Sequence, residues 1–250
     1  MLNRYSIVTL LACFTFFASC AGIKPYDTIN ISTDRNIINI LKDKSERVKS
    51  VSASLGLIPA IITGPELSAY MSYNQEGQFK LTGLTPTGFT LFSFETTDNQ
   101  YTLALSDGRS ITGDVKGSDI SFKDISGIDI PIEINMTKEV IDFYGSDSEQ
   151  GAFFLIEDLR GYYILNQLES DGALSYPIRR WWINKKDMAV SRKEIFSRHK
   201  DRIGERVYEA AYDDFRLIDN ILTPFEIVIK DGKENKLIKM KFYSVEYNKN

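Results

Sequence analysis

The sequence predicts a mainly β, α+β protein built on an antiparallel sheet or barrel. From Val51 onward, short apolar stretches alternate with Gly, Pro, Asn and Asp at spacings of about 8 to 12 residues, which is typical of antiparallel strands joined by turns. Aromatic residues, which favour strands, make up 12% of the 250 residues. Two late stretches alternate apolar and polar residues, as a half-buried sheet requires.

The first residues carry a targeting signal. The apolar run Ile7–Ala18 is shorter than the roughly 20 residues that cross a bilayer core. It follows Arg4 and ends in small residues, which predicts a secretory signal peptide over 1–19. The sequence Phe17-Ala18-Ser19-Cys20 resembles a bacterial lipobox, which implies cleavage before Cys20 and lipidation of its sulfur. The alternative is an ordinary signal peptide in which Cys20 is incidental.

The cysteine count favours lipidation. Cys13 and Cys20 are the only cysteines, so cleavage leaves one thiol with no partner in the chain. A lone exposed thiol is a liability in an oxidising compartment, and acylation removes it while anchoring the protein to a membrane. In lipoproteins an Asp after the cysteine commonly favours inner-membrane retention. Ala21 stands there, so the resemblance implies the outer membrane.

The rest of the chain is predicted to be a lipidated tether over 20–32 and one domain over 33–250. An amphipathic pattern predicts a helix over Asp34–Ser50, and a second short helix is predicted over Met136–Tyr144. The predicted strands are Val51–Ile58, Leu67–Tyr73, Gln78–Leu84, Thr90–Thr96, Tyr101–Leu105, Ser110–Val115, Ala152–Glu157, Gly161–Leu168, Ile178–Asn184, Met188–Phe196, Glu205–Asp213, Phe215–Ile218, Pro224–Lys230 and Lys236–Tyr247. In the last strand the apolar phase slips near Ser244, which predicts a β-bulge.

Charge is distributed unevenly. Ile178–Arg206 holds 10 basic and 4 acidic residues, whereas Glu95–Asp171 holds 5 basic and 16 acidic ones. The basic stretch is either a set of solvated strand edges or a positive face for anionic headgroups or an acidic protein partner. The residues assigned to this candidate basic face are Arg179, Arg180, Arg192, Lys193 and Arg198.

The Arg179-Arg180-Trp181-Trp182 run has two interpretations. One tryptophan lies in the core and the other at a rim with an arginine stacked on it, or the run forms a belt at a headgroup boundary.

Catalytic and cofactor motifs are absent. The chain lacks the nucleophile elbow, the zinc-protease helix motif and the glycine-rich phosphate loops, and His199 is its single histidine. We therefore expect no enzyme activity, no metal and no cofactor. The formal net charge of −4 gives no general attraction to nucleic acid.

Several motifs together resemble envelope proteins of the LolA/LolB type. The resemblance is carried by Gly77–Gly83, Thr87–Phe92, Tyr163–Leu165, Arg179–Ile183, Val190–Phe196 and Pro224–Ile227. It implies a single strongly curved antiparallel sheet, an unclosed barrel with helices capping its mouth. It also implies a hollow that binds acyl chains of lipids or lipoproteins, in a protein that faces the periplasm.

Candidate cavity residues follow from the apolar strands. Some of these strands are apolar on both faces, so they need cover on both sides or a cavity on one. The residues assigned to the cavity, or otherwise to plain core, are Phe89, Leu91, Phe154, Ile164, Ile227 and Met240. The alternative function is a scaffold with a solid core, whose basic face binds another envelope protein.

Overall fold

The computed structural model describes residues 34–60, 66–76, 78–97, 100–114, 153–170, 172, 174–198 and 200–248. These residues belong to one unit, 31–250. The predicted signal peptide, Cys20, the tether, the predicted helix over Met136–Tyr144 and His199 lie outside the described residues.

The described part of the chain contains one α-helix and thirteen strands. The helix is α2 (Asp34–Arg47), and a short 3-10 helix, η2, covers Lys200–Arg202. The strands are β1 (Ser50–Pro59), β2 (Leu67–Asn74), β3 (Phe79–Leu84), β4 (Thr90–Thr97), β5 (Gln100–Leu105), β6 (Ser110–Asp114), β7 (Phe153–Leu159), β8 (Tyr162–Ser170), β9 (Ser175–Asn184), β10 (Val190–Phe196), β11 (Arg206–Ile218), β12 (Ile221–Asp231) and β13 (Lys236–Tyr247).

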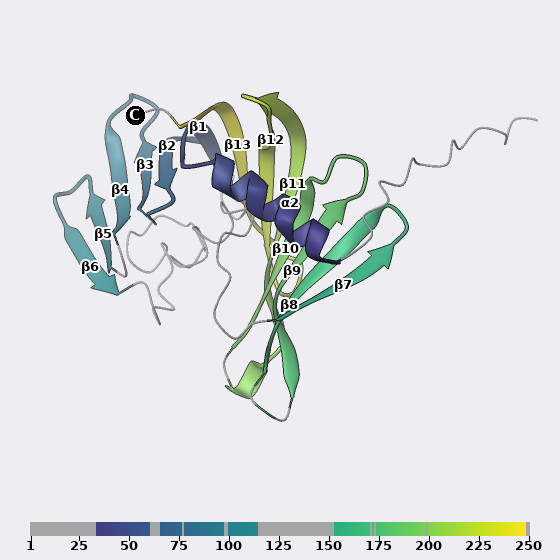
Figure 1. Cartoon of the computed structure of the whole chain (residues 1–250). Coiled ribbons are helices and arrows are strands. Elements are labelled where there is room, and N and C mark those ends of the chain that lie inside the picture. The colour runs from purple at the N-terminus through teal and green to yellow at the C-terminus, as the bar shows by residue number, and fades with distance from the viewer. Residues whose placement is uncertain are drawn as a thin grey trace, which may run out of the picture. The chain divides into compact units, whose positions relative to one another are not determined.

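All thirteen strands form one antiparallel sheet. Its order is β6-β5-β4-β3-β2-β1-β13-β12-β11-β10-β9-β8-β7, so the first and last strands of the chain pair at its middle. Two meanders extend from this pair, β1–β6 to one edge and β13–β7 to the other (Figure 1). Because β6 and β7 are not paired with each other, the sheet is not closed into a barrel. The predicted fold class, a curved and unclosed antiparallel sheet, is confirmed.

One break predicted between two strands is absent from the sheet. The predicted break at Asp214 is wrong: β11 is one strand, although Asp214 has a φ of +51°. β12 pairs with β11 in the same register on both sides of that residue. The Asp213 carboxylate accepts a hydrogen bond from the Asp214 amide at 2.8 Å, which supports the local left-handed backbone.

The predicted bulge in the last strand is confirmed. Ser54 of β1 lies opposite Ser244, while Leu55 lies opposite Phe242, so Tyr243 is the additional residue. The bulge returns Val245 to the buried face of the sheet, where the alternation would otherwise have turned it outward.

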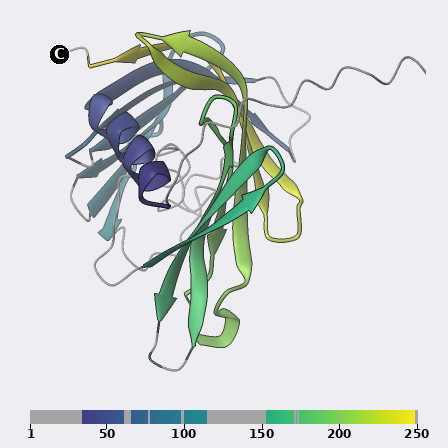
Figure 2. The same ribbon diagram turned by 45° about the vertical axis from the view of Figure 1, so that its right-hand side comes forward.

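The helix packs on one face of the sheet, which we call the inner face. Ile37 and Leu41 of α2 are buried in the same apolar core as this face, and Figure 2 shows the helix crossing it. The helix ends three residues earlier than predicted, because Ser50 already pairs in β1. Its last turn is held by Asn248, whose side-chain amide donates to the carbonyl of Arg47 at 2.9 Å.

A second polar contact holds the helix at another place on the β13–β7 meander. The Lys44 ammonium donates to the Met188 carbonyl, in the turn between β9 and β10, at 2.7 Å. Burial lowers the pKa of Lys44, and the nearby Asp187 carboxylate opposes that shift. Asn248 follows β13, so both contacts tie α2 to the β13–β7 meander.

Candidate binding face and its polar cluster

The inner face is apolar across most of the sheet. Alternate residues of each strand point to one side, so the register identifies which side chains share this face. Ile227 of β12 and Met240 of β13 lie opposite each other and are 0% and 3% exposed. The other buried apolar members are Val51, Ala53, Leu55, Leu57, Ala69, Met71, Phe79, Leu81, Phe92, Phe94, Tyr101, Leu103, Tyr163, Leu165, Trp181, Ile183, Val190, Tyr208, Ala210, Tyr212, Phe225, Ile229, Ile238, Phe242, Val245 and Tyr247.

Aromatic rings fill the inner face of β3, β4 and β5. The ring centroid of Phe94 lies 6.0 Å from that of Phe79 and 6.2 Å from that of Tyr101. Phe92 lies opposite Gly83, and a Cβ at Gly83 would come within 2.3 Å of its ring. The glycine therefore provides the space that this ring occupies next to β3.

Polar side chains interrupt the inner face on β8, β9 and β10. Gln167 lies opposite Arg179, and Trp181 lies opposite Lys193, so the four residues are neighbours on one side of three strands. Each is less than a tenth exposed. An Arg179 Nη1 proton is donated to Gln167 Oε1 at 3.2 Å, and Lys193 Nζ lies 5.8 Å from the ring centroid of Trp181.

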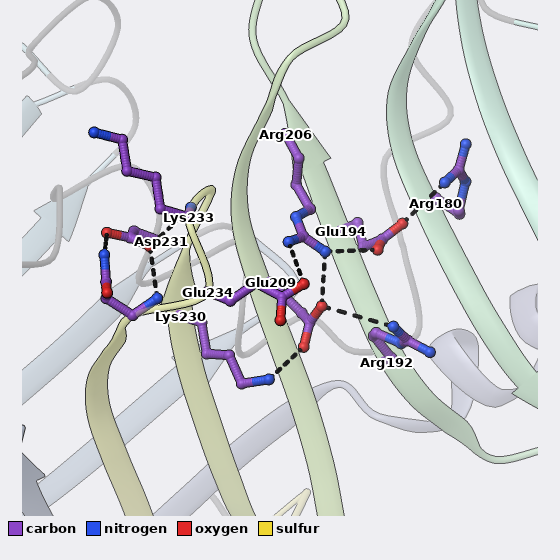
Figure 3. Close-up of polar contacts among 10 residues, drawn as sticks. Arg180, Arg192, Glu194, Arg206, Glu209, Lys230, Asp231, Lys233 and Glu234 are labelled. Carbon is purple, nitrogen blue, oxygen red and sulfur yellow. Dashed lines mark hydrogen bonds and ion pairs between the residues drawn. The ribbon is translucent and has the colours of Figure 1, made fainter.

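The opposite, outer face of the same strands carries two buried glutamates. Figure 3 shows Glu194 of β10 between Arg180 and Arg206, with N–O distances of 3.2 and 3.3 Å. Glu209 of β11 binds Arg206 at 3.0 Å and Lys230 at 3.1 Å. Both glutamate side chains are only 6% exposed, and these ion pairs compensate their burial.

Aromatic rings extend this outer network. Arg192, which pairs with Glu209 at 3.7 Å, stacks its guanidinium 4.0 Å from the ring centroid of Trp182. The Arg180 guanidinium lies 5.2 Å from the ring centroid of Phe196. Trp181 is therefore in the core, and Trp182 is on the outer face under an arginine. The first interpretation of the Arg-Trp run is confirmed.

Arg206 is the centre of the network. Its hydrogen bond to Glu234 at 3.0 Å, with further contributions from Glu194 and Glu209, raises the pKa of Arg206. The same hydrogen bond lowers the pKa of Glu234. Three carboxylates around one guanidinium keep it charged and hold the start of β11 against β10 and the β12–β13 turn.

The predicted cavity residues are only partly brought together. Ile227 and Met240 lie on the inner face, and Leu91 and Phe154 pack at its border. The prediction is wrong for Phe89, which is 74% exposed because it ends the tight turn that begins at Thr85. Ile164 is buried on the outer face beside Trp182, since it is one residue out of phase with Leu165.

The five predicted basic residues do not form one face. Arg179 and Lys193 point to the inner face, and Arg180 and Arg192 point to the outer one. The outer pair is bound to Glu194 and Glu209, which lie on the same side of β10 and β11. Alternation along a strand separates neighbouring residues, so a basic run in sequence is not a basic surface in the fold.

Arg198 follows β10 and pairs with Glu169 of β8 at 3.2 Å. Glu194, Glu209 and Gln167 were not predicted as site residues. The available signal was the place of Glu194 as the single acid in the basic strand Val190–Phe196, and the position of Glu209 between the apolar residues Tyr208 and Ala210.

The described residues contain no group of three or more His, Cys, Asp or Glu side chains arranged to hold a metal ion. Over the same ranges, no helix is both long enough and apolar enough to cross a membrane.

The fold places the chain among proteins with an open, LolA-like antiparallel sheet. It is similar to a domain from Vibrio parahaemolyticus named as an outer membrane lipoprotein-sorting protein, with 12% identity and a TM-score of 0.54 over 85% of this chain and 92% of that one. A LolA superfamily protein from Nitrosomonas europaea has 10% identity and a TM-score of 0.53, over 85% and 94%. A DUF1329 family protein from Desulfovibrio piger has 14% identity and a TM-score of 0.50, over 86% and 92%.

At these identities the likeness is one of fold. No protein-family model matches the sequence, and no curated protein matches it. The predicted resemblance to LolA-type proteins is thus confirmed for the architecture of the sheet.

Proposed function

We propose that this protein is a lipid-anchored component of the bacterial envelope that holds acyl chains of lipids or lipoproteins against its inner face. The observation that carries the proposal is the apolar inner face of an unclosed sheet, which runs from Tyr101 of β5 through Ile227 of β12 to Leu165 of β8 and is interrupted by polar side chains on β8, β9 and β10. The similar fold of proteins named for lipoprotein sorting supports it.

Hydrocarbon is a suitable ligand for such a face. Each methylene removed from water contributes about 0.8 kcal/mol, so an acyl chain gains affinity from contact area without needing specific hydrogen bonds. Holding a chain requires no bond to be broken, and we propose that the protein is not an enzyme.

Anchoring through Cys20 explains how such a protein stays at its membrane. Acylation of this residue would keep it at the outer membrane, facing the periplasm, as the Ala21 position implies. In a bacterial host fed radiolabelled palmitate, the full-length chain should incorporate label and its Cys20→Ala variant should not. Equal labelling of both chains would disprove the anchor.

Acyl binding is tested by filling the inner face. Ala210 of β11 is buried on this face beside Ile229, and Ala211, the next residue, points to the other side. Ala210→Phe should reduce binding of a fluorescent fatty acid several-fold, and Ala211→Phe should not. Circular dichroism verifies that both variants keep the β-sheet spectrum.

Two results would contradict the proposal. One is a wild-type protein that binds no fatty acid and carries no extractable lipid after purification. The other is an equal loss of binding in the two phenylalanine variants, which would mean that the ligand does not contact the inner face.

A further inference from the structure

Two uncharged hydrogen-bond donors on the inner face of β8 and β9 are not matched by an acceptor. Gln167 accepts a hydrogen bond from Arg179 Nη1 through its Oε1 at 3.2 Å, so its amide nitrogen is directed elsewhere. Neither Gln167 Nε2 nor Trp181 Nε1 has a hydrogen-bond partner in the part of the chain that the structure describes. Both groups can only donate, so the atom that would complete them is an oxygen acceptor.

Both donors are deeply buried. Gln167 is 0% exposed and Trp181 is 4% exposed, so bulk water does not reach their N–H groups. Buried donors without acceptors are rare in folded proteins and destabilise them. An acceptor that arrives as part of a ligand would remove this cost.

The two donors are close enough to share one acceptor. Gln167 lies opposite Arg179, and Trp181, two residues further along β9, lies opposite Leu165. Gln167 and Trp181 are thus diagonal neighbours on one side of two paired strands, a spacing of about 7–8 Å. Long and aromatic side chains reach each other at that spacing, so one oxygen between them can accept from both N–H groups.

The acceptor needs no charge of its own. Arg179 and Lys193, on the same face, have interactions of their own, so the two uncharged donors alone specify the acceptor. A carbonyl oxygen is the ordinary partner of such N–H groups. Leu165 and Ile183, 3% and 0% exposed on the same face, are apolar neighbours of Trp181, and next to such side chains a neutral oxygen costs less to bury than a charged one.

We infer that Gln167 Nε2 and Trp181 Nε1 bind the carbonyl oxygen of an acyl ester or acyl amide whose hydrocarbon lies along the inner face. This inference rests on the proposed function, since it assigns the polar end of the same ligand. From the two donors the apolar face continues through Ala210 of β11 to Ile229 of β12, which lie opposite each other. The site therefore distinguishes an acyl group from a plain hydrocarbon.

The test compares ligands that differ in the carbonyl group. Full-length protein from a bacterial host is purified in detergent, and methyl oleate, N-methyl oleamide and octadecene are each used to displace a bound fluorescent fatty acid. The first two separate an ester from an amide as the source of the carbonyl, and octadecene supplies hydrocarbon alone. We expect the wild-type protein to bind at least one carbonyl compound about tenfold more tightly than octadecene, because the carbonyl completes two buried donors.

Three variants test the residues. Trp181→Phe and Gln167→Glu should each reduce that preference to about threefold or less and leave the affinity for octadecene unchanged. Gln167→Glu keeps an oxygen for Arg179 and replaces the Nε2 donor with a second oxygen. Trp182→Phe is the matched control, because Trp182 is adjacent in sequence but lies on the outer face under Arg192, so it should keep the wild-type preference. Should one of the first two variants fail to fold, the other still tests the site.

The indole N–H resonance of Trp181 gives a readout that is independent of affinity. Its loss from the spectrum of Trp181→Phe assigns it. A hydrogen bond to a carbonyl deshields the donated proton, so the resonance should move downfield with methyl oleate and not with octadecene. A resonance that moves equally with both ligands would show that the indole N–H does not bind the carbonyl.

The outcomes separate this inference from the proposed function. Equal affinity of the wild-type protein for the carbonyl compounds and octadecene overturns the carbonyl site and leaves acyl-chain binding intact. A preference that survives both Trp181→Phe and Gln167→Glu also overturns it. Displacement by none of the three ligands overturns the proposed function itself.

Discussion

The two meanders of the sheet share an architecture and differ in how they are stabilised. In β1–β6 the inner face is packed with aromatic and aliphatic side chains, and the ion pairs described there, such as Lys80 with Glu95, are exposed. In β7–β13 a polar network crosses the outer face, and cations lie on the inner one. Of the nine buried polar or charged residues in the described ranges, only Thr96 lies in the first meander.

The two halves of the sheet differ in how they accommodate buried polar groups. Apolar packing tolerates few polar groups, because each buried donor or charge needs a partner. The first meander meets that demand by excluding polar residues. The second meets it with paired glutamates on the outer face.

The largest expected effect is in the aromatic core of the first meander. Phe94→Ala removes a fully buried ring from between Phe79 and Tyr101 and should lower the free energy of unfolding by about 3–5 kcal/mol. Phe89→Ala, at an exposed turn position, should change it by less than about 0.5 kcal/mol. Urea denaturation followed by fluorescence measures both, and equal effects would show that the ring packing is not what stabilises this half.

The outer network of the second meander should rank next. Glu194→Gln removes a buried carboxylate that two arginines share and should cost about 2–3 kcal/mol. Glu95→Gln is the matched change in the first meander, where the pair with Lys80 is about half exposed, and should cost less than about 1 kcal/mol. An equal loss of stability in Glu194→Gln and Glu95→Gln at low salt would contradict this difference between the two meanders.

A smaller effect is expected where Gly83 lies beneath Phe92. Gly83→Ala places a methyl group against that ring and should cost about 1–3 kcal/mol through displaced packing. The double variant Gly83→Ala with Phe92→Leu should lose less than the two single changes added together, since the smaller side chain no longer meets the methyl group. Thermal unfolding of the wild-type protein, the two single variants and the double variant gives a double-mutant cycle. Strictly additive losses of stability would show that Gly83 and Phe92 are not in contact.

The smallest effect at neutral pH concerns Tyr247, where the meanders meet. Burial raises the pKa of Tyr247 from 10.0 to about 12, and the hydroxyl forms a hydrogen bond with Thr223 at 2.7 Å. Because the folded pKa lies above the unfolded one, this contribution is full below pH 10 and is lost as pH rises toward 12. The unfolding midpoint should fall over that range, and Tyr247→Phe should flatten the fall. If the unfolding midpoint of Tyr247→Phe fell as steeply with pH as that of the wild-type protein, other groups would be the cause of the fall.

Local patterns in the sequence were enough to predict most of the strands and the helix. Turn residues and alternation located twelve of the thirteen strands within a few residues, and the phase slip near Ser244 located the bulge at Tyr243. These features are local, because the period of two and the turn chemistry are written in adjacent residues. Asp214 shows the limit: β12 continues the pairing where the local pattern predicts a break.

Which side chains meet depends on strand pairing and register between distant parts of the chain. The pairing of β1 with β13 joins residues nearly 200 positions apart, and the register of β8, β9 and β10 brings Gln167, Arg179, Trp181 and Lys193 together. A shift of one residue in β10 would exchange its inner and outer faces, and it would place Lys193 beside Glu209 and move Glu194 to the inner face. Composition showed the excess of basic charge in this region, but register assigned Lys193 to the inner face and Arg192 to the outer.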